Sequence, residues 1–159
     1  MNFKKYFICT ISLVPLACAA QSKTSEPSWV SKCKPLENAI SEITKSGQFN
    51  LASIRMIHKI NNETSGCDDG FYAEGMTDVV ARSLAADFSN IAKSAKKDSQ
   101  LVEFVSKHLN SSADWKDLDK VVIQSKNSCP SDATEFCKRI GGISKKASDE
   151  AKEVTKKSK

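Results

Sequence analysis

Cysteine is the residue type with the clearest chemistry in this chain. Cys9 and Cys18 fall in an apolar N-terminal segment. The remaining cysteines form an even set: Cys33, Cys67, Cys129 and Cys137. An even number of cysteines in a short exported chain is typical of disulfide bonds. Four cysteines allow three pairings, and we favour Cys33–Cys67 with Cys129–Cys137 because each pair brackets neighbouring helical segments.

The other residue types that bind metals or catalyse reactions form no recognisable set. The two histidines, His58 and His108, are distant in sequence from the cysteines, and no Cys-x-x-Cys pair occurs, so we expect no zinc site. No G-x-S-x-G, H-E-x-x-H or glycine-rich phosphate loop is present. We therefore expect a protein that is not an enzyme and binds no cofactor or metal. His108 is predicted to be a structural residue at the edge of the core, beside Leu109.

The segment from residue 67 to 75 combines three carboxylates with two adjacent aromatic side chains. It supplies too few regularly spaced oxygen ligands for a calcium site. In one interpretation, the two aspartates cap a helix while Phe71 or Tyr72 enters the core. The alternative is a protein-binding edge, because exposed aromatic residues often anchor interfaces. The candidate partner-binding residues are Asp68, Asp69, Tyr72 and Glu74.

Residues 1–20 have the pattern of a secretory signal peptide. Lys4 and Lys5 precede an apolar run over residues 6–16, and Ala17-x-Ala19 supplies a cleavage signal. The run is too short for a stable membrane span, so we place the processed chain in the periplasm. The residues before Cys18 resemble a lipobox, which leaves a lipoprotein anchored at Cys18 as the alternative. Pro15 disfavours that anchor, because a bulky aliphatic residue is usual there.

The positive charge of the chain is concentrated at its two ends. The formal net charge of +5 includes Lys4 and Lys5, and residues 143–159 carry six lysines against three carboxylates. The residues between 21 and 142 therefore balance. A nucleic-acid-binding protein would need lysine and arginine clustered on a folded face, so we expect no nucleic-acid partner.

Apolar residues recur at spacings of three and four along most of the chain, which predicts helices. The segments with this pattern cover residues 36–43, 51–60, 72–91, 101–109, 113–128 and 133–140. No alternating pattern typical of a β-strand occurs. The sequence predicts an all-α fold, a small bundle of about five to six helices held by two disulfides.

Glycine and proline set the predicted boundaries. Pro35 suits the first turn of the first helix, and the pair Gly141-Gly142 is predicted to end the last one. Gly75 lies inside the central helix, where we expect a close contact with another helix. We therefore expect a flexible lead-in over residues 21–30, a disulfide-bonded helical domain over 31–142, and a lysine-rich tail over 143–159 that is either a frayed helix or disordered.

The order of these features resembles that of the Rap/Tai immunity proteins of type VI secretion systems. The resemblance rests on a cysteine near the start of the processed chain, a helix-turn-helix from Leu101 onward, a closing Cys129-Pro130, and a mid-chain run of Cys67, Tyr72, Gly75, Met76, Thr77 and Asp78. Proteins of that family are small, helical and disulfide-bonded, and they block peptidoglycan amidase effectors in the periplasm. Cys137 and the lysine-rich tail depart from the family's pattern, so only the class of function is transferred.

The resemblance implies a non-catalytic periplasmic immunity protein that neutralises a toxic peptidoglycan hydrolase effector, with a homodimer as one form it could take. An acid-stress periplasmic chaperone of the HdeA type is the alternative, since such proteins are also small, helical, disulfide-bonded and lysine-rich. A structural envelope protein tethered by lipid at Cys18 is the third hypothesis.

Overall fold

The computed structural model describes residues 28–157, which form six α-helices and one 3-10 turn and include no β-strand. The predicted signal peptide, Cys9, Cys18 and the lead-in up to residue 27 lie outside the described residues. The elements are α1 (Ser28–Ser46), α2 (Leu51–Glu63), α3 (Gly70–Ala95), α4 (Ser99–Lys107), α5 (Trp115–Asn127), the 3-10 turn η1 (Ser131–Ala133) and α6 (Thr134–Lys157). The predicted all-α class is therefore confirmed.

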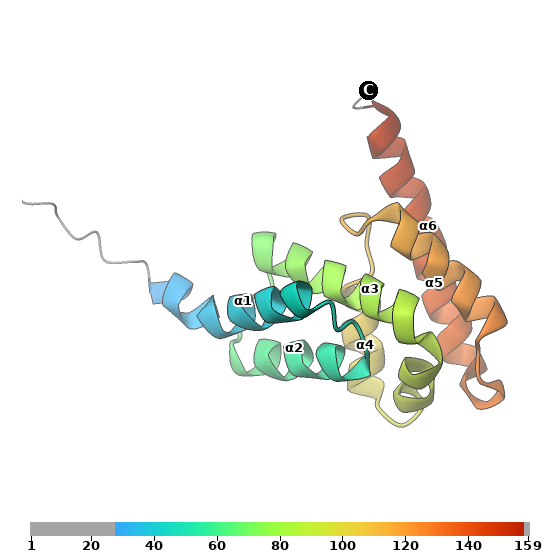
Figure 1. Ribbon diagram of the computed structural model, residues 1–159, viewed down its shortest axis with the longest axis horizontal. Coiled ribbons are helices and arrows are strands. Elements are labelled where there is room, and N and C mark those ends of the chain that lie inside the picture. Colours follow the sequence, from blue (N-terminus) through green and yellow to red (C-terminus); the bar gives the residue numbers. More distant parts are fainter. Residues whose placement is uncertain (1–27, 158–159) are drawn as a thin grey trace, which may run out of the picture.

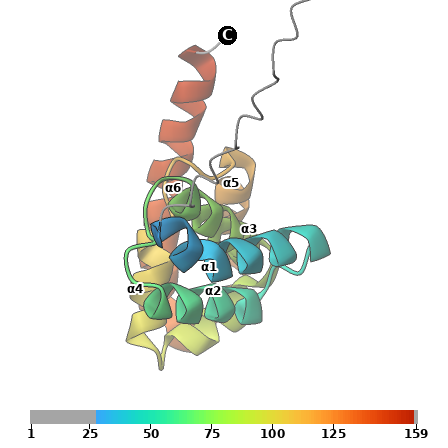
Figure 2. The ribbon, with the colours of Figure 1, turned by 90° about the vertical axis from the view of Figure 1, so that its left-hand side faces the viewer.

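α3 is the central helix of the bundle and packs against each of the other five. Figures 1 and 2 show α1, α2 and α3 side by side, while the hairpin of α5 and α6 runs in a different direction beside them. α3 is buried on several sides because its apolar residues are not confined to one stripe. Its large buried side chains are Met76, Val79, Val80, Leu84, Phe88 and Ile91. Burial of each contributes roughly 1.5–3 kcal/mol relative to exposure.

Both predicted disulfides are present. Cys33 and Cys67 join α1 to the loop before α3, with their Cα atoms 5.6 Å apart. Cys129 and Cys137 join the loop after α5 to α6, with a Cα separation of 6.0 Å. The favoured pairing is therefore confirmed. One bridge lies in the N-terminal half of the chain and the other in the C-terminal half.

The close approach expected at Gly75 is also present. A β-carbon at this position would lie 3.1 Å from two carbon atoms of Ile40 in α1, so the missing side chain lets α1 and α3 pack tightly. The start of α1 differs from the prediction. Because the helix begins at Ser28, residues 28–30 are helical, and Pro35 lies inside the helix instead of in its first turn.

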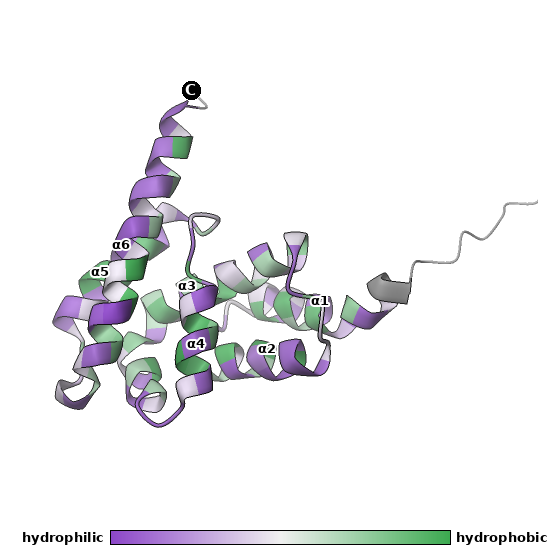
Figure 3. Cartoon of the chain, turned by 180° about the vertical axis from the view of Figure 1, so that it is seen from behind, coloured by the Kyte–Doolittle hydropathy of each residue, from purple (hydrophilic) through white to green (hydrophobic). Residues whose placement is uncertain are grey.

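The last helix does not end at Gly141-Gly142, so that prediction is wrong. α6 continues to Lys157, and residues 143–157 are helical instead of frayed or disordered. Gly141 is a packing residue within the helix: a β-carbon there would lie 2.4 Å from Ser125 Oγ of α5. Figure 3 shows that the last turns of α6 are mostly hydrophilic, as the sequence predicts.

Polar contacts and small side chains hold the C-terminal half of α6 against α5. Ser148 Oγ donates a hydrogen bond of 2.6 Å to Asp119 Oδ1, and Lys152 Nζ lies 2.7 Å from Asp119 Oδ2. These two donors lower the pKa of the Asp119 carboxyl group. Ala147 and Ala151 are buried on the same side of the helix. None of the described helices combines the length and the apolar character needed to span a membrane.

Candidate functional site

The predicted partner-binding residues lie around the first turn of α3. Cys67 is buried and bonded to α1, so the disulfide anchors the chain directly before this turn. Asp69 is the N-cap, and its Oδ1 accepts a hydrogen bond of 2.7 Å from the backbone N–H of Gly70. Gly70 has a φ of 50°, a conformation that glycine adopts without steric cost. The predicted cap at Asp69 is therefore confirmed, whereas Asp68, expected to cap the same helix, does not do so.

The two aromatic side chains of the turn have different environments. Tyr72 is half-buried and packs against the core, whereas 69% of Phe71 is exposed. Their ring centroids are 5.7 Å apart in an edge-to-face arrangement. Glu74, one turn after Phe71, is exposed. We call the set of Asp69, Phe71, Tyr72 and Glu74 the α3 edge, of which all but Tyr72 are exposed.

Asp68 faces the end of α4 and is not part of the α3 edge. Its Oδ2 forms an ion pair with Lys107 Nζ, and its Oδ1 lies 3.6 Å from His108 Nε2. The Asp68 side chain is only 17% exposed. Of the four predicted partner-binding residues, Asp69 and Glu74 are therefore exposed and Tyr72 is half-buried. Asp68 ties the loop before α3 to the end of α4.

A cluster of aromatic rings lies beneath this loop. The ring of Phe104 stacks on His58 of α2 with a centroid distance of 4.7 Å, and its centroid lies 4.6 Å from that of His108. His108 is 2% exposed, and its Nε2 atom has no hydrogen-bond partner. It is thus deeper in the core than the predicted edge position.

Burial governs the protonation of His108. Removal from water disfavours the imidazolium and lowers the pKa of His108 below 6.5. Asp68 opposes this shift, while the positive charge of Lys107 and the neighbouring His58 add to it.

Sequence reasoning missed this cluster because Asp68 and His108 are far apart in the chain. Its only local signal is the one-turn spacing of Phe104 and His108.

The described residues place no metal-binding cluster and no free thiol at the α3 edge. Among residues 28–157, no group of three or more histidine, cysteine or carboxylate side chains could hold a metal ion. The cysteines in that range are all disulfide-bonded. The α3 edge instead presents an aromatic ring flanked by the carboxylates of Asp69 and Glu74.

The described residues therefore form a helical bundle with two disulfides. The exposed aromatic ring of Phe71 lies close in sequence to the Cys33–Cys67 bridge. No family model, curated protein or solved structure matches the chain.

Proposed function

We propose that this protein is a non-catalytic periplasmic immunity protein that binds and neutralises a toxic peptidoglycan hydrolase effector of a type VI secretion system. The observation that carries the proposal is Phe71, an aromatic residue that is 69% exposed, the highest value among the exposed large hydrophobic residues in the described part of the chain. Aromatic side chains that fill a pocket of a partner often account for most of the binding energy of an interface. The flanking carboxylates of Asp69 and Glu74 favour a partner with basic groups around that pocket.

The rigidity of the α3 edge supports the same proposal. The disulfide of Cys67, the cap at Asp69 and the contact between Phe71 and Tyr72 restrict this turn before any partner arrives. A preorganised surface loses less conformational entropy on binding, which favours the slow dissociation that an inhibitor needs. The two disulfides fit an oxidising compartment such as the periplasm.

The test begins with cross-linking of the chain in its own host cells and identification of any peptidoglycan hydrolase bound to it. The affinity of that hydrolase is then measured for the wild type, for Phe71→Ala and for Met56→Ala. Met56 is a matched control because it is also exposed, at 45%, but lies on α2. We expect Phe71→Ala to weaken binding by about 2 kcal/mol or more, roughly 30-fold.

Met56→Ala should bind like the wild type. Recovery of no hydrolase would contradict the proposal, and so would equal survival of a deletion strain attacked by its wild-type siblings. If a hydrolase binds but Phe71→Ala binds it normally, the assignment of the α3 edge is wrong.

His108 favours a second candidate, an acid-stress chaperone. A buried imidazole with a lowered pKa must take up a proton in acid, and protonation inside the core favours opening of the structure. Such opening would expose apolar surface to client proteins. The test acidifies the chain to about pH 2 with a client enzyme and measures aggregation after neutralisation. Protection in acid together with no hydrolase binding would favour this candidate over the first.

A further inference from the structure

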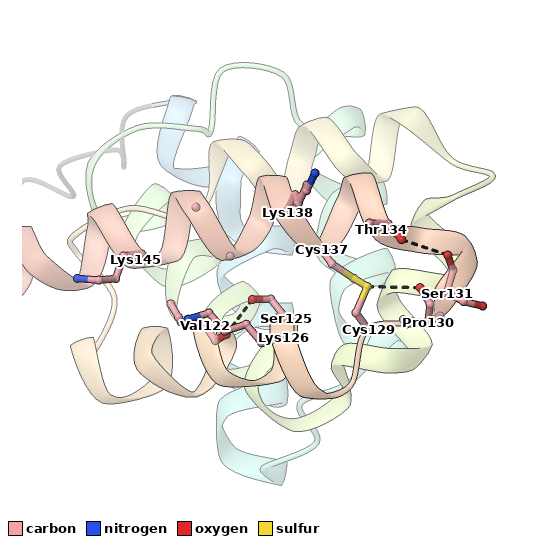
Figure 4. Close-up of a pocket in the computed structure, with 12 residues that line it drawn as sticks. Val122, Ser125, Lys126, Cys129, Pro130, Ser131, Thr134, Cys137, Lys138 and Lys145 are labelled. Carbon is pink, nitrogen blue, oxygen red and sulfur yellow. Dashed lines mark hydrogen bonds between the residues drawn. A yellow bond between two sulfur atoms is a disulfide. The ribbon is translucent and has the colours of Figure 1, made fainter.

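A groove runs between α5 and α6 beside the second disulfide (Figure 4). Its volume is 560 Å³, within the range of ligand-binding clefts. The apolar part of its lining consists of Val122, Pro130, the Cys129–Cys137 bridge, Gly141 and Gly142. In Figure 1 the α5–α6 turn and the start of α3 lie at opposite ends of the molecule, so the groove is separate from the α3 edge.

Gly142 is not explained by packing within the chain. It lies inside α6, where glycine costs up to about 1 kcal/mol relative to alanine. Its φ is not positive, so the backbone does not require glycine. A β-carbon at Gly142 would meet no atom within 4 Å, in contrast to its neighbour Gly141. The effect of the missing side chain is therefore to leave the groove open.

The charge of the groove is of one sign. Lys126 of α5 and Lys138 and Lys145 of α6 contribute to its lining, and no aspartate or glutamate does. Lys145 forms an ion pair with Asp149 one turn further along α6. Ser131 and Thr134 add hydroxyl groups at the end nearest the disulfide. Such a lining complements an acidic ligand with apolar side chains.

We propose that this groove binds an extended acidic segment of a partner protein. A small apolar side chain of that segment lies over Gly142 and Val122. The carboxylates of the segment face Lys126 and Lys138. The proposal does not depend on which protein binds the α3 edge.

The test selects binders of the oxidised full chain from a displayed library of random twelve-residue peptides. The affinity of the selected peptides is measured for the wild type and for Gly142→Gln, Lys138→Glu, Gly142→Ala and Lys97→Glu. We expect the selected peptides to be rich in aspartate and glutamate and to bind more weakly as salt is raised. Gly142→Gln adds a long side chain to the lining of the groove and should weaken binding about tenfold or more.

Lys138→Glu should weaken binding by about fivefold or more, because it replaces an attraction with a repulsion. Lys97, an exposed lysine outside the groove, is the matched control, and Lys97→Glu should stay within about twofold of the wild type. Gly142→Ala adds a single methyl group where the partner side chain lies, so it should weaken binding less than Gly142→Gln. Lys138→Glu is a surface substitution, so it tests the groove even if Gly142→Gln does not fold.

Selected peptides that are neutral or basic would overturn the proposal. So would acidic peptides that bind Gly142→Gln and Lys138→Glu as tightly as the wild type. Binding of the chain to vesicles containing phosphatidylglycerol would also overturn it, if Lys138→Glu abolished that binding and no acidic peptide competed for it.

Discussion

Gly141 and Gly142 are neighbours in α6, yet the structure predicts opposite effects of the same substitution at the two positions. At Gly142 an alanine β-carbon meets nothing within 4 Å, so only the helix propensity changes. We expect Gly142→Ala to raise the free energy of unfolding by about 1 kcal/mol. At Gly141 the same gain is offset, because the new β-carbon would lie 2.4 Å from Ser125 Oγ and 3.1 Å from Ser125 Cβ.

Overpacking of this kind costs roughly 1–3 kcal/mol. The hydroxyl group of Ser125 can rotate away, but it then loses its hydrogen bond of 2.8 Å to the carbonyl of Val122. We therefore expect Gly141→Ala to lower the free energy of unfolding by about 1 kcal/mol, which places the two alanine variants about 2 kcal/mol apart. Each kcal/mol should move the melting temperature by about 3 °C.

The assay is equilibrium unfolding in urea, followed by far-ultraviolet circular dichroism with both disulfides intact. Ser125→Ala serves as the second mutation of a double-mutant cycle. It removes the 2.4 Å contact, so it should recover part of the stability lost in Gly141→Ala and leave Gly142→Ala unaffected. If both alanine variants were more stable than the wild type, the packing role of Gly141 would be refuted. If Gly142→Ala were less stable, Gly142 would have a structural role, and the argument for an open groove would fail.

Three further predictions concern the rest of the bundle. Replacing Cys33 and Cys67 together by alanine should lower the free energy of unfolding by about 4 kcal/mol, because the bridge, with a sequence separation of 34, restricts the unfolded chain. An unchanged urea midpoint would contradict this. Because the pKa of His108 is lowered in the folded state, the unfolded chain takes up the proton first as the pH falls. The contribution of His108 to the free energy of unfolding is therefore complete above pH 6.5 and decreases as the pH drops below it. His108→Phe should reduce this fall between about pH 7.5 and pH 5, and an identical pH profile would count against the buried neutral imidazole. Because the pKa of Asp119 is lowered, its contribution to the free energy of unfolding is present above pH 3.8 and is lost below it. Asp119→Asn should therefore speed hydrogen exchange over residues 148–157 at neutral pH. Unchanged exchange there would show that the contacts of Asp119 do not hold the end of α6.

Local chemistry explains which predictions from the sequence are confirmed. Helices follow from the spacing of apolar residues, because that spacing places them on a common face whatever the rest of the fold. The cap at Asp69 needs only the backbone N–H groups of its own helix. The disulfide pairing was predictable because each pair joins segments that a compact bundle brings together.

The candidate site could be predicted only in part. Its position at the start of α3 follows from the composition of residues 67–75. The roles within it do not, because either aromatic side chain could have entered the core, and the packing around Tyr72 decided that Phe71 is the exposed one. Asp68 faces Lys107 and His108, which no local pattern in the sequence indicates.

The sequence by itself determined the helical class and the cap of α3, because periodicity and capping act within a few residues. It favoured one of three disulfide pairings, and the structure decided between them. Only the tertiary structure decided what Gly141 and Gly142 do. A glycine pair near the end of a pattern can stop a helix or let one helix pack closely on another. Here α6 continues through the pair, and Gly141 lies close to Ser125 of α5. The same holds for His108, whose lowered pKa depends on burial and on side chains from α2 and the loop before α3. Such distant pairings arise from the packing of whole helices, which residue spacing does not specify.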